Sequence, residues 1–303
     1  GIMTENVAFQ AIDYLVKNST DELLHIAFLG GEPLLNFPLL KKVVEYCKQI
    51  SADTGKKFSY TITTNGTLIT DNIEKYLTEN KIVCQISLDG TKEKNDMNRF
   101  FRNKKGSYDV IVEKTKSMRH MNLVTARATV TPDNSDYKEI FNHLNELEFR
   151  AIPIAIAQNM VDDEQFDKIL SEYINYIFYF EELILTKQYA KAKKMTDLVN
   201  ALEKIEFGNV RNNGCGAGRT MFAVDIDGTL YPCHRFVGER KFALGNIWTG
   251  SDNSKFLKMI NVRNRDKCSK CWAQNLCLGC CPHENYTNTN NINLASERSC
   301  RMA

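Results

Sequence analysis

The residue type best suited to chemistry in this sequence is cysteine. The chain has 303 residues and 10 cysteines, and all of them except Cys47 and Cys84 lie between Cys215 and Cys300. Disulfides are rare in a reducing compartment, so thiols gathered in one region indicate metal ligation more than disulfide pairing. The two isolated cysteines suit small buried positions in a core. The change in cysteine content predicts a domain boundary near residue 210.

The spacing within this region is typical of metal centres. Cys268-x2-Cys271 allows two thiolates to face one centre from a tight turn. Upstream, Asp227-Gly228 interrupts an alternating apolar run and predicts a β-hairpin. Such a hairpin would return the chain so that Cys233 approaches Cys215.

Two kinds of metal centre fit thiolates at this spacing. Structural zinc takes four thiolates, or three thiolates with a histidine such as His234 or His283. A four-iron cluster also takes four thiolates. Free buried thiols are a poor explanation for so many cysteines in one short region. Because ligand chemistry does not separate zinc from iron, the rest of the sequence has to decide between them.

The first 156 residues alternate strand-like and helix-like runs, which are the elements that would position other reactive groups. Strands in series with helices predict a parallel sheet with the helices outside it. Five strands make a partial barrel rather than a closed eight-stranded one. The expected strands cover residues 23–29, 58–63, 82–88, 125–130 and 151–156, and residues 164–207 are expected to be helical throughout.

Glycine and short polar residues follow the first four strands at their carboxyl ends, where the sites of such folds lie. Each segment also has a simpler explanation, because Glu32 could cap a helix and Asp89-Gly90 could be a plain turn. Their recurrence at one edge of the sheet favours a binding site. The segments are Gly30-Gly31-Glu32-Pro33, Thr64-Asn65-Gly66, Ser87-Leu88-Asp89-Gly90 and Thr129-Val130-Thr131.

Composition and charge count against several classes of partner. The formal net charge is +2, which provides no strong field for nucleic acid. The sequence has no run of about 18 apolar residues, so no membrane span is expected. Residues 1–10 lack a basic-then-apolar signal pattern, so a cytoplasmic protein is expected.

The ordered motifs resemble those of radical S-adenosylmethionine (SAM) enzymes with a C-terminal SPASM domain. Gly30-Gly31-Glu32-Pro33 is similar to the GGEP motif of that superfamily. The later segments at the carboxyl edge, with Arg99 and Arg127, resemble its following motifs. The resemblance covers nearly the whole chain. Its downstream part is Cys215-x12-Gly228-x4-Cys233, then Cys268-x2-Cys271-x5-Cys277-x3-Cys281, then Cys300.

The resemblance implies an α/β fold, namely a partial (β/α) TIM-like barrel followed by a small cysteine-rich α+β SPASM domain. Residues 1–160 would form the radical SAM partial barrel without its N-terminal portion. Residues 161–209 would form a helical bridge. Residues 210–303 would form the SPASM domain and hold two auxiliary [4Fe–4S] clusters.

The resemblance also assigns ligands to both auxiliary clusters. Residues 206–213 contain no cysteine, so the inner cluster would have an open iron site where a substrate thiolate could bind. Cys280 could be the fourth inner ligand instead, although a packed or inert thiol is the preferred interpretation. Cys268, Cys271, Cys277 and Cys300 would hold the outer cluster, and Cys215, Cys233 and Cys281 the inner one.

SAM would bind at the carboxyl edge of the sheet. The resemblance implies that Glu32 and the backbone of residues 30–33 receive the methionyl amino group of SAM. Ser87 and Arg127 would hold its ribose and carboxylate, and Asn65 and Asp89 complete the predicted site.

The Cys-x3-Cys-x2-Cys motif that defines the superfamily is absent from the 29 residues before Gly30. In relatives this motif binds the cluster that cleaves SAM. We therefore expect a longer enzyme whose preceding segment holds a third, SAM-binding [4Fe–4S] cluster. The chain as printed is not expected to cleave SAM.

The resemblance implies a peptide maturase. A 5′-deoxyadenosyl radical from SAM would abstract hydrogen from a cysteine-containing precursor peptide made by the ribosome. The carbon radical would then couple with a cysteine sulfur and give a thioether crosslink. The auxiliary clusters would accept the surplus electron, and a flavodoxin or ferredoxin would donate electrons, so that the cofactors carry the difficult chemistry.

Other functions stay open from the sequence. In relatives that mature sulfatases, an aspartate base occupies the position of His234, so histidine there counts against sulfatase-type oxidation. His234 is the candidate catalytic residue, and a hydrogen bond to the cluster is preferred over a role as general base. The further alternatives are a non-catalytic iron–sulfur module, for electron transfer or peptide binding, and a zinc-stabilised binding protein.

Overall fold

The computed structural model describes residues 1–208 and 213–303 and divides into two compact units. One unit consists of Gly1–Leu24, Pro38–Phe58 and Glu203–Ala303. The other consists of His25–Phe37 and Ser59–Leu202. The predicted boundary at residues 209 and 210 lies outside the described residues, and the predicted domain limits stay predictions.

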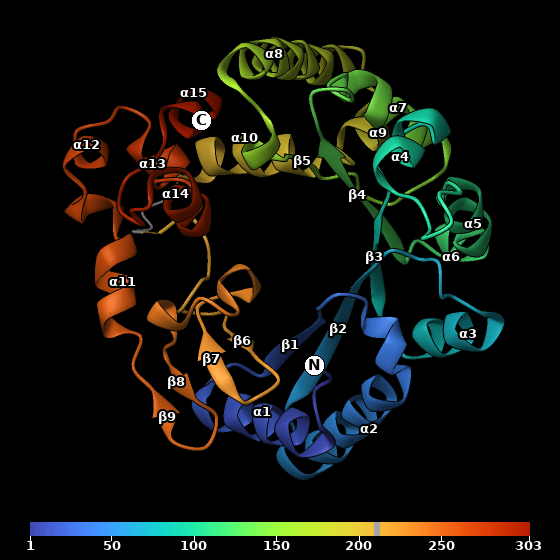
Figure 1. The fold of residues 1–303 in the computed structure, drawn as a ribbon, viewed down its shortest axis with the longest axis vertical. Coiled ribbons are helices and arrows are strands. Elements are labelled where there is room, and N and C mark those ends of the chain that lie inside the picture. The colour runs from blue at the N-terminus through green and yellow to red at the C-terminus, as the bar shows by residue number, and fades with distance from the viewer. Residues whose placement is uncertain (209–212) are drawn as a thin grey trace. The chain divides into compact units, whose positions relative to one another are not determined.

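Five strands form one sheet whose spatial order is the same as their order in the chain. β2 pairs with β3, β3 with β4 and β4 with β5, and each of these pairs is parallel. This sheet and the helices between its strands confirm the predicted partial barrel (Figure 1). The strands are β1 (Leu23–Phe28), β2 (Lys57–Thr64), β3 (Val83–Ser87), β4 (Val124–Val130) and β5 (Ile154–Ile156).

One face of the middle strands is closed by apolar packing. Ile62, Ile86 and Ala126 on successive strands have no exposed surface. Thr70 and Asp136 are side-chain N-caps, since they accept a backbone N–H from the first turn of α3 and α7, respectively. The connecting elements are η1 (Pro33–Asn36), α2 (Phe37–Thr54), α3 (Asp71–Glu79), α4 (Lys92–Asn98), α5 (Tyr108–Lys114), α6 (Lys116–His120), α7 (Tyr137–Glu146) and η2 (Gln158–Met160).

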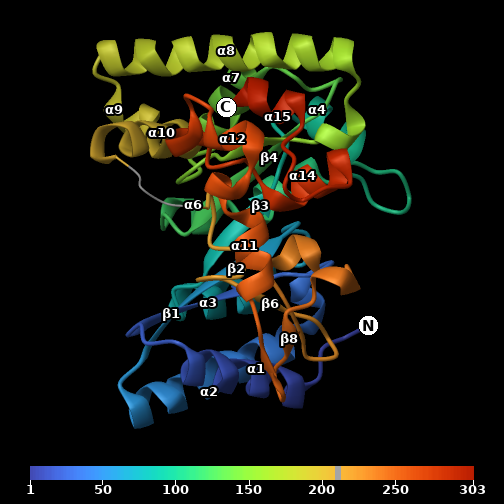
Figure 2. The same cartoon turned by 90° about the vertical axis from the view of Figure 1, so that its left-hand side faces the viewer.

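Three helices follow the sheet: α8 (Asp163–Leu185), α9 (Tyr189–Ala192) and α10 (Thr196–Phe207). α8 begins with a capping box, in which Asp162 and Gln165 each accept the other's backbone N–H. Figure 2 shows α8 as one uninterrupted coil. After it, Lys187 has a φ of 60°, which a right-handed helix does not allow. The prediction of continuous helix over residues 164–207 is therefore wrong.

A small antiparallel sheet in the order β6-β7-β8-β9 lies in the cysteine-rich region. β6 (Ala223–Val224) pairs with β7 (Thr229–Tyr231) across the predicted hairpin, which is thereby confirmed. Gly228 has a φ of 80°, and a Cβ there would lie 2.4 Å from the ring of Trp248, so only glycine fits this turn. The remaining strands are β8 (Gly245–Asn246) and β9 (Gly250–Ser251).

The N-terminal helix α1 (Glu5–Asn18) packs on this small sheet. Val7 is buried in one cluster with Leu230 and Ile247. Among the described residues, no helix is long and apolar enough to cross a bilayer. The other short elements here are η3 (His234–Phe236), η4 (Arg240–Phe242), α11 (Ser254–Ile260), η5 (Val262–Asn264), α12 (Asp266–Ser269), α13 (Gln274–Cys277), α14 (Pro282–Thr289) and α15 (Glu297–Met302).

Candidate cofactor and cluster sites

Glu32 joins the loop after β1 to the end of β2. Its Oε1 accepts hydrogen bonds from the Leu34 backbone N–H at 3.1 Å and from Thr64 Oγ1 at 2.7 Å. Its Oε2 accepts the Asn65 backbone N–H at 2.9 Å. The carboxylate therefore caps a helix, which was the simpler explanation for Glu32. It also connects the predicted segments at residues 30–33 and 64–66.

The two glycines before Glu32 leave space at this edge. Gly30 has a φ of 152°, and a Cβ added to Gly30 or Gly31 would meet no described atom within 4 Å. A ligand group can thus approach the backbone closely, which is a common use of glycine. This open backbone is compatible with the predicted role of residues 30–33 in holding the methionyl end of SAM.

Loss of the Glu32 carboxylate should loosen this edge. We expect Glu32→Ala to lower the free energy of unfolding by about 1–3 kcal/mol, because the backbone N–H of Asn65 and the hydroxyl of Thr64 lose their acceptor. Urea unfolding of the anaerobic protein measures this. Glu45→Ala, which removes an exposed carboxylate paired with Lys48, is the control. Equal unfolding free energies for the two variants would contradict the positioning role of Glu32.

Asp89 connects the end of β3 to two other segments. Its Oδ2 accepts from Arg99 Nε at 2.6 Å, and its Oδ1 accepts from Arg99 Nη2 at 3.1 Å and from the Thr129 backbone N–H at 2.8 Å. Asn134 donates its side-chain N–H to the Asp89 carbonyl at 2.7 Å. Because both carboxylate oxygens are used internally, the geometry favours a positioning role, and direct contact with SAM stays a prediction.

Ser87 and Arg127 are direct neighbours in the register of β3 and β4. Both are half-buried, whereas the residues that flank them on their strands are fully buried. The two predicted SAM contacts therefore lie side by side on the face of the sheet opposite the apolar packing.

This face is polar across four strands, which the sequence analysis missed. His25 on β1 contacts Ser59 Oγ at 2.9 Å and Thr61 Oγ1 at 3.0 Å on β2. Thr63 donates to Gln85 Oε1 at 3.3 Å on β3. Parallel sheets are usually apolar on both faces, so a polar face indicates a site for polar ligands. The signal in the sequence was the alternation of Ser59, Thr61 and Thr63 along β2.

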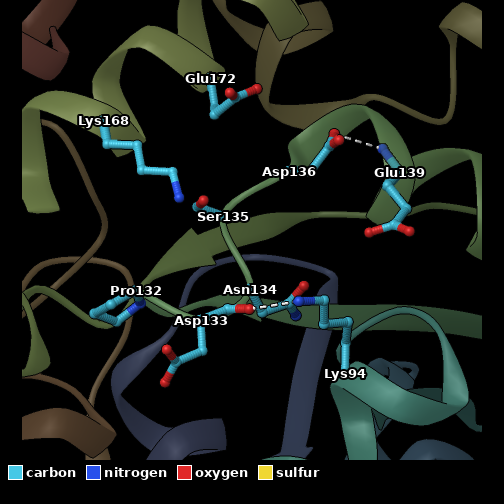
Figure 3. Close-up of a pocket in the computed structure, with 9 residues that line it drawn as sticks. All are labelled: Lys94, Pro132, Asp133, Asn134, Ser135, Asp136, Glu139, Lys168 and Glu172. Atoms are coloured by element: carbon cyan, nitrogen blue, oxygen red, sulfur yellow. Dashed lines mark hydrogen bonds between the residues drawn. The ribbon is translucent and has the colours of Figure 1, made fainter.

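A polar pocket lies beyond the carboxyl end of β4 and was not predicted either. Lys168 and Glu172 of α8 face the loop of residues 132–136 across it (Figure 3). Lys94 of α4 holds this loop by donating to the Asp133 carbonyl at 2.7 Å. The residues that line the pocket carry charges of both signs. No residue pattern in the loop predicted the pocket.

The three thiols assigned to the inner cluster lie close enough to affect one another. Burial raises the pKa of Cys233, the backbone N–H groups of Arg235 and Phe236 lower it, and the thiols of Cys281 and Cys215 raise it. Arg235 donates to Cys281 Sγ at 3.5 Å. The hairpin thus returns Cys233 toward Cys215, as expected.

The four thiols assigned to the outer cluster form a second group. Burial raises the pKa of Cys300, Lys267 lowers it, and Cys277, Cys268 and Cys271 raise it. Arg265, beside Cys268, is buried and donates to the carbonyls of Gly279 and Ile260. Such cations balance the charge of thiolates, so both thiol groups suit an iron–sulfur cluster by their donor chemistry.

Cys280 belongs to the outer group. Its Sγ lies 3.3 Å from Cys277 Sγ. The thiol hydrogen bond from Cys280 lowers the pKa of Cys277, and the same contact raises that of Cys280. The alternative that Cys280 completes the inner set is therefore not supported by its contacts.

Two other predictions concern nearby residues. His234 lies in η3 directly after Cys233 and is exposed, and its catalytic role stays a prediction. The stretch searched for a fourth inner cysteine includes residues 209–212, which lie outside the described residues. Within the described part of the chain, no three histidine, cysteine or acidic side chains are placed to hold one metal ion.

Two family models match this chain. The model of the radical SAM superfamily matches residues 2–147, and that of the SPASM iron-sulfur cluster-binding domain matches residues 215–272. The first contains all the predicted SAM-binding residues. The second contains Cys215, Cys233, Cys268 and Cys271, while the other assigned ligands lie beyond its end.

Several known proteins are similar to this chain. A cysteine-type anaerobic sulfatase-maturating enzyme of Clostridium novyi (strain NT) is 26% identical over 304 residues, which cover 92% of this chain and 79% of the relative. The radical SAM cyclopropyl synthase TigE of Paramaledivibacter caminithermalis is 24% identical over 233 residues, covering 75% of this chain and 47% of the relative.

A solved structure described as native anSMEcpe with bound AdoMet shares the fold, with a TM-score of 0.79 at 21% identity. The structural match covers 100% of this chain and 86% of the chain in that structure. The order of the parallel sheet and the cysteine-rich region along the chain agrees with the order of the two matched models. The chain therefore carries a radical SAM domain followed by an SPASM domain, and these two domains imply SAM and [4Fe–4S] clusters as its cofactors.

Proposed function

We propose that this chain is part of a peptide maturase that forms a thioether from a cysteine of a ribosomally made precursor peptide. The observation that carries the proposal is the inner thiol group, in which Cys215, Cys233 and Cys281 gather without a fourth cysteine in residues 206–213. A four-iron cluster takes four ligands, so three protein thiolates leave room for a thiolate of the substrate.

When bound, SAM and the iron–sulfur clusters supply the hydrogen-abstracting radical and the acceptor for the surplus electron. The residues of the chain bind and orient. Glu32 and the open backbone of Gly30 and Gly31 would hold the methionyl end of SAM. Ser87 and Arg127 would hold its ribose and carboxylate on the polar sheet face. Arg235, which donates to Cys281 Sγ, places positive charge beside the thiolates of the inner group.

A second candidate is sulfatase-type oxidation of a cysteine, favoured by the similarity to sulfatase-maturating enzymes over 92% of this chain. His234 stands where such enzymes were expected to have an aspartate base. Both candidates share a cysteine-containing peptide as the partner, and an electron donor such as flavodoxin or ferredoxin suits either one.

Mass spectrometry of a cysteine-containing candidate peptide distinguishes these reactions. The full-length enzyme is loaded anaerobically with iron, sulfide and SAM and is incubated with the peptide and a reductant. We expect a loss of two hydrogens and one thiol that alkylation no longer labels. A peptide with serine in place of its cysteine is the control and should stay unchanged.

Each other product has a defined meaning. Loss of sulfur from the peptide would support oxidation of the sulfatase type. A new carbon–carbon or carbon–oxygen bond with an unchanged thiol count would overturn both candidates. An unmodified peptide would favour a non-catalytic iron–sulfur module.

A further inference from the structure

Cys280 is the cysteine of this region to which no role has been assigned. It lies in the loop Leu278-Gly279-Cys280-Cys281 between α13 and α14. Leu278, Gly279 and Cys280 have φ angles of 54°, 81° and 61°, so three consecutive residues are left-handed. Residues with a side chain rarely adopt this conformation, and where they do the strain often has a functional reason.

The loop directs two adjacent thiols to different groups. Cys280 Sγ lies 3.3 Å from Cys277 Sγ, and it contacts the carbonyl oxygen of Ser299, the residue before Cys300, at 3.6 Å. Cys281, its neighbour in the chain, instead accepts from Arg235 beside the inner thiols. The outer site therefore has five thiols, although a four-iron cluster takes four.

The distance between the two sulfurs decides how the fifth thiol can act. A disulfide sulfur pair is about 2.05 Å apart, so Cys277 and Cys280 are separate thiols. Two sulfurs as close as 3.3 Å would both lie within reach of one iron when the cluster is bound. Each iron of such a cluster takes one protein thiolate. Cys277 and Cys280 would thus be alternative ligands of one iron.

We propose that Cys280 is a reserve thiolate of the outer auxiliary cluster and exchanges with Cys277 at one iron. In the exchange, the bond from iron to Cys280 sulfur forms and the thiol of Cys280 releases its proton. The bond from iron to Cys277 sulfur breaks and that sulfur takes up a proton. The iron keeps its oxidation state, so no oxidant or reductant is needed. The inference rests on the SPASM cluster and not on the thioether reaction.

Iron and sulfide analysis of anaerobically reconstituted variants tests this exchange. Cys277→Ala should keep about eight irons per chain in two clusters, because Cys280 replaces the missing ligand. Cys277→Ala with Cys280→Ala should keep about four. Cys271→Ala is the matched control, since among the described residues no hydrogen bond joins its sulfur to another thiol, and it should also keep about four.

A second variant controls for misfolding of the loop that contains Cys280. Cys280→Gly relieves the left-handed strain and should keep about eight irons with an unchanged electron paramagnetic resonance spectrum of the inner cluster. Loss of about four irons in Cys277→Ala, equal to the loss in Cys271→Ala, would overturn the proposal.

The unmodified protein provides an independent readout. Slow alkylation of the cluster-loaded chain followed by peptide mapping should label Cys277 in some molecules and Cys280 in others. Label confined to Cys280 would show that Cys277 never leaves the iron and would overturn the exchange. Neither measurement depends on the identity of the peptide product.

Discussion

Cys233→Ser should halve the iron content of the reconstituted chain, from about eight to about four atoms. Cys233 is 7% exposed, directly precedes η3, and receives backbone N–H groups of Arg235 and Phe236 at its sulfur. Its group has three assigned cysteines, so removal of one leaves two protein ligands. A serine hydroxyl is a far weaker ligand than a thiolate, and the inner cluster should be lost. Iron and acid-labile sulfide analysis measures the change.

Cys84→Ala is the matched control for this loss. Cys84 has no exposed surface in β3, and burial raises its pKa to about 12, so it stays a neutral thiol. This variant should keep about eight irons. An unchanged iron content in Cys233→Ser would show that Cys233 is not a ligand of the inner cluster. Zinc in place of iron in the parent chain would reverse the cluster assignment for both thiol groups.

The parallel sheet and the hairpin could be predicted from the sequence because local signals and long-range packing agree there. Apolar runs bounded by glycine marked the strands, and Asp227-Gly228 requires the positive φ that Gly228 adopts. The long helical stretch failed at Lys187, where a residue without any special turn preference is left-handed. Lys187 is exposed and belongs to a local C-terminal cap of α8, in which the N–H groups of Lys187 and Gln188 donate to carbonyls of the last turn, and no glycine marked this cap in the sequence.

The candidate sites were predicted unevenly for a similar reason. Spacing located the thiols, but the grouping of Cys280 with Cys277 depends on the left-handed loop and could not be deduced from spacing. The polar face with His25 and Thr61 was missed because strands of a parallel sheet are usually apolar on both faces, so a polar face is not the default expectation. The roles in cofactor binding came from the resemblance, since the same motifs taken singly describe caps and turns.

Asp89→Ala should lower the free energy of unfolding by about 3–5 kcal/mol, which is the range for removing one partner of a buried ion pair. The Asp89 side chain is 5% exposed and that of Arg99 is 29% exposed. The substitution leaves the Arg99 guanidinium partly buried without its carboxylate and also removes the acceptor of the Thr129 backbone N–H. Three segments at the carboxyl edge lose a common partner, so the effect should exceed that of Glu32→Ala.

An exposed ion pair in the same unit provides the control for this prediction. Lys75 and Glu79 lie 3.9 Å apart on α3, and the Glu79 side chain is 60% exposed, so Glu79→Ala should change the unfolding free energy by at most about 0.5 kcal/mol. Asp89→Asn keeps the shape of the side chain and an acceptor oxygen, and it should fall between the two. Urea unfolding of the anaerobic, cluster-loaded proteins measures all three. If Asp89→Ala is no more destabilising than Glu79→Ala, the Asp89–Arg99 pair does not hold this edge together, and Asp89 would be available to contact SAM directly.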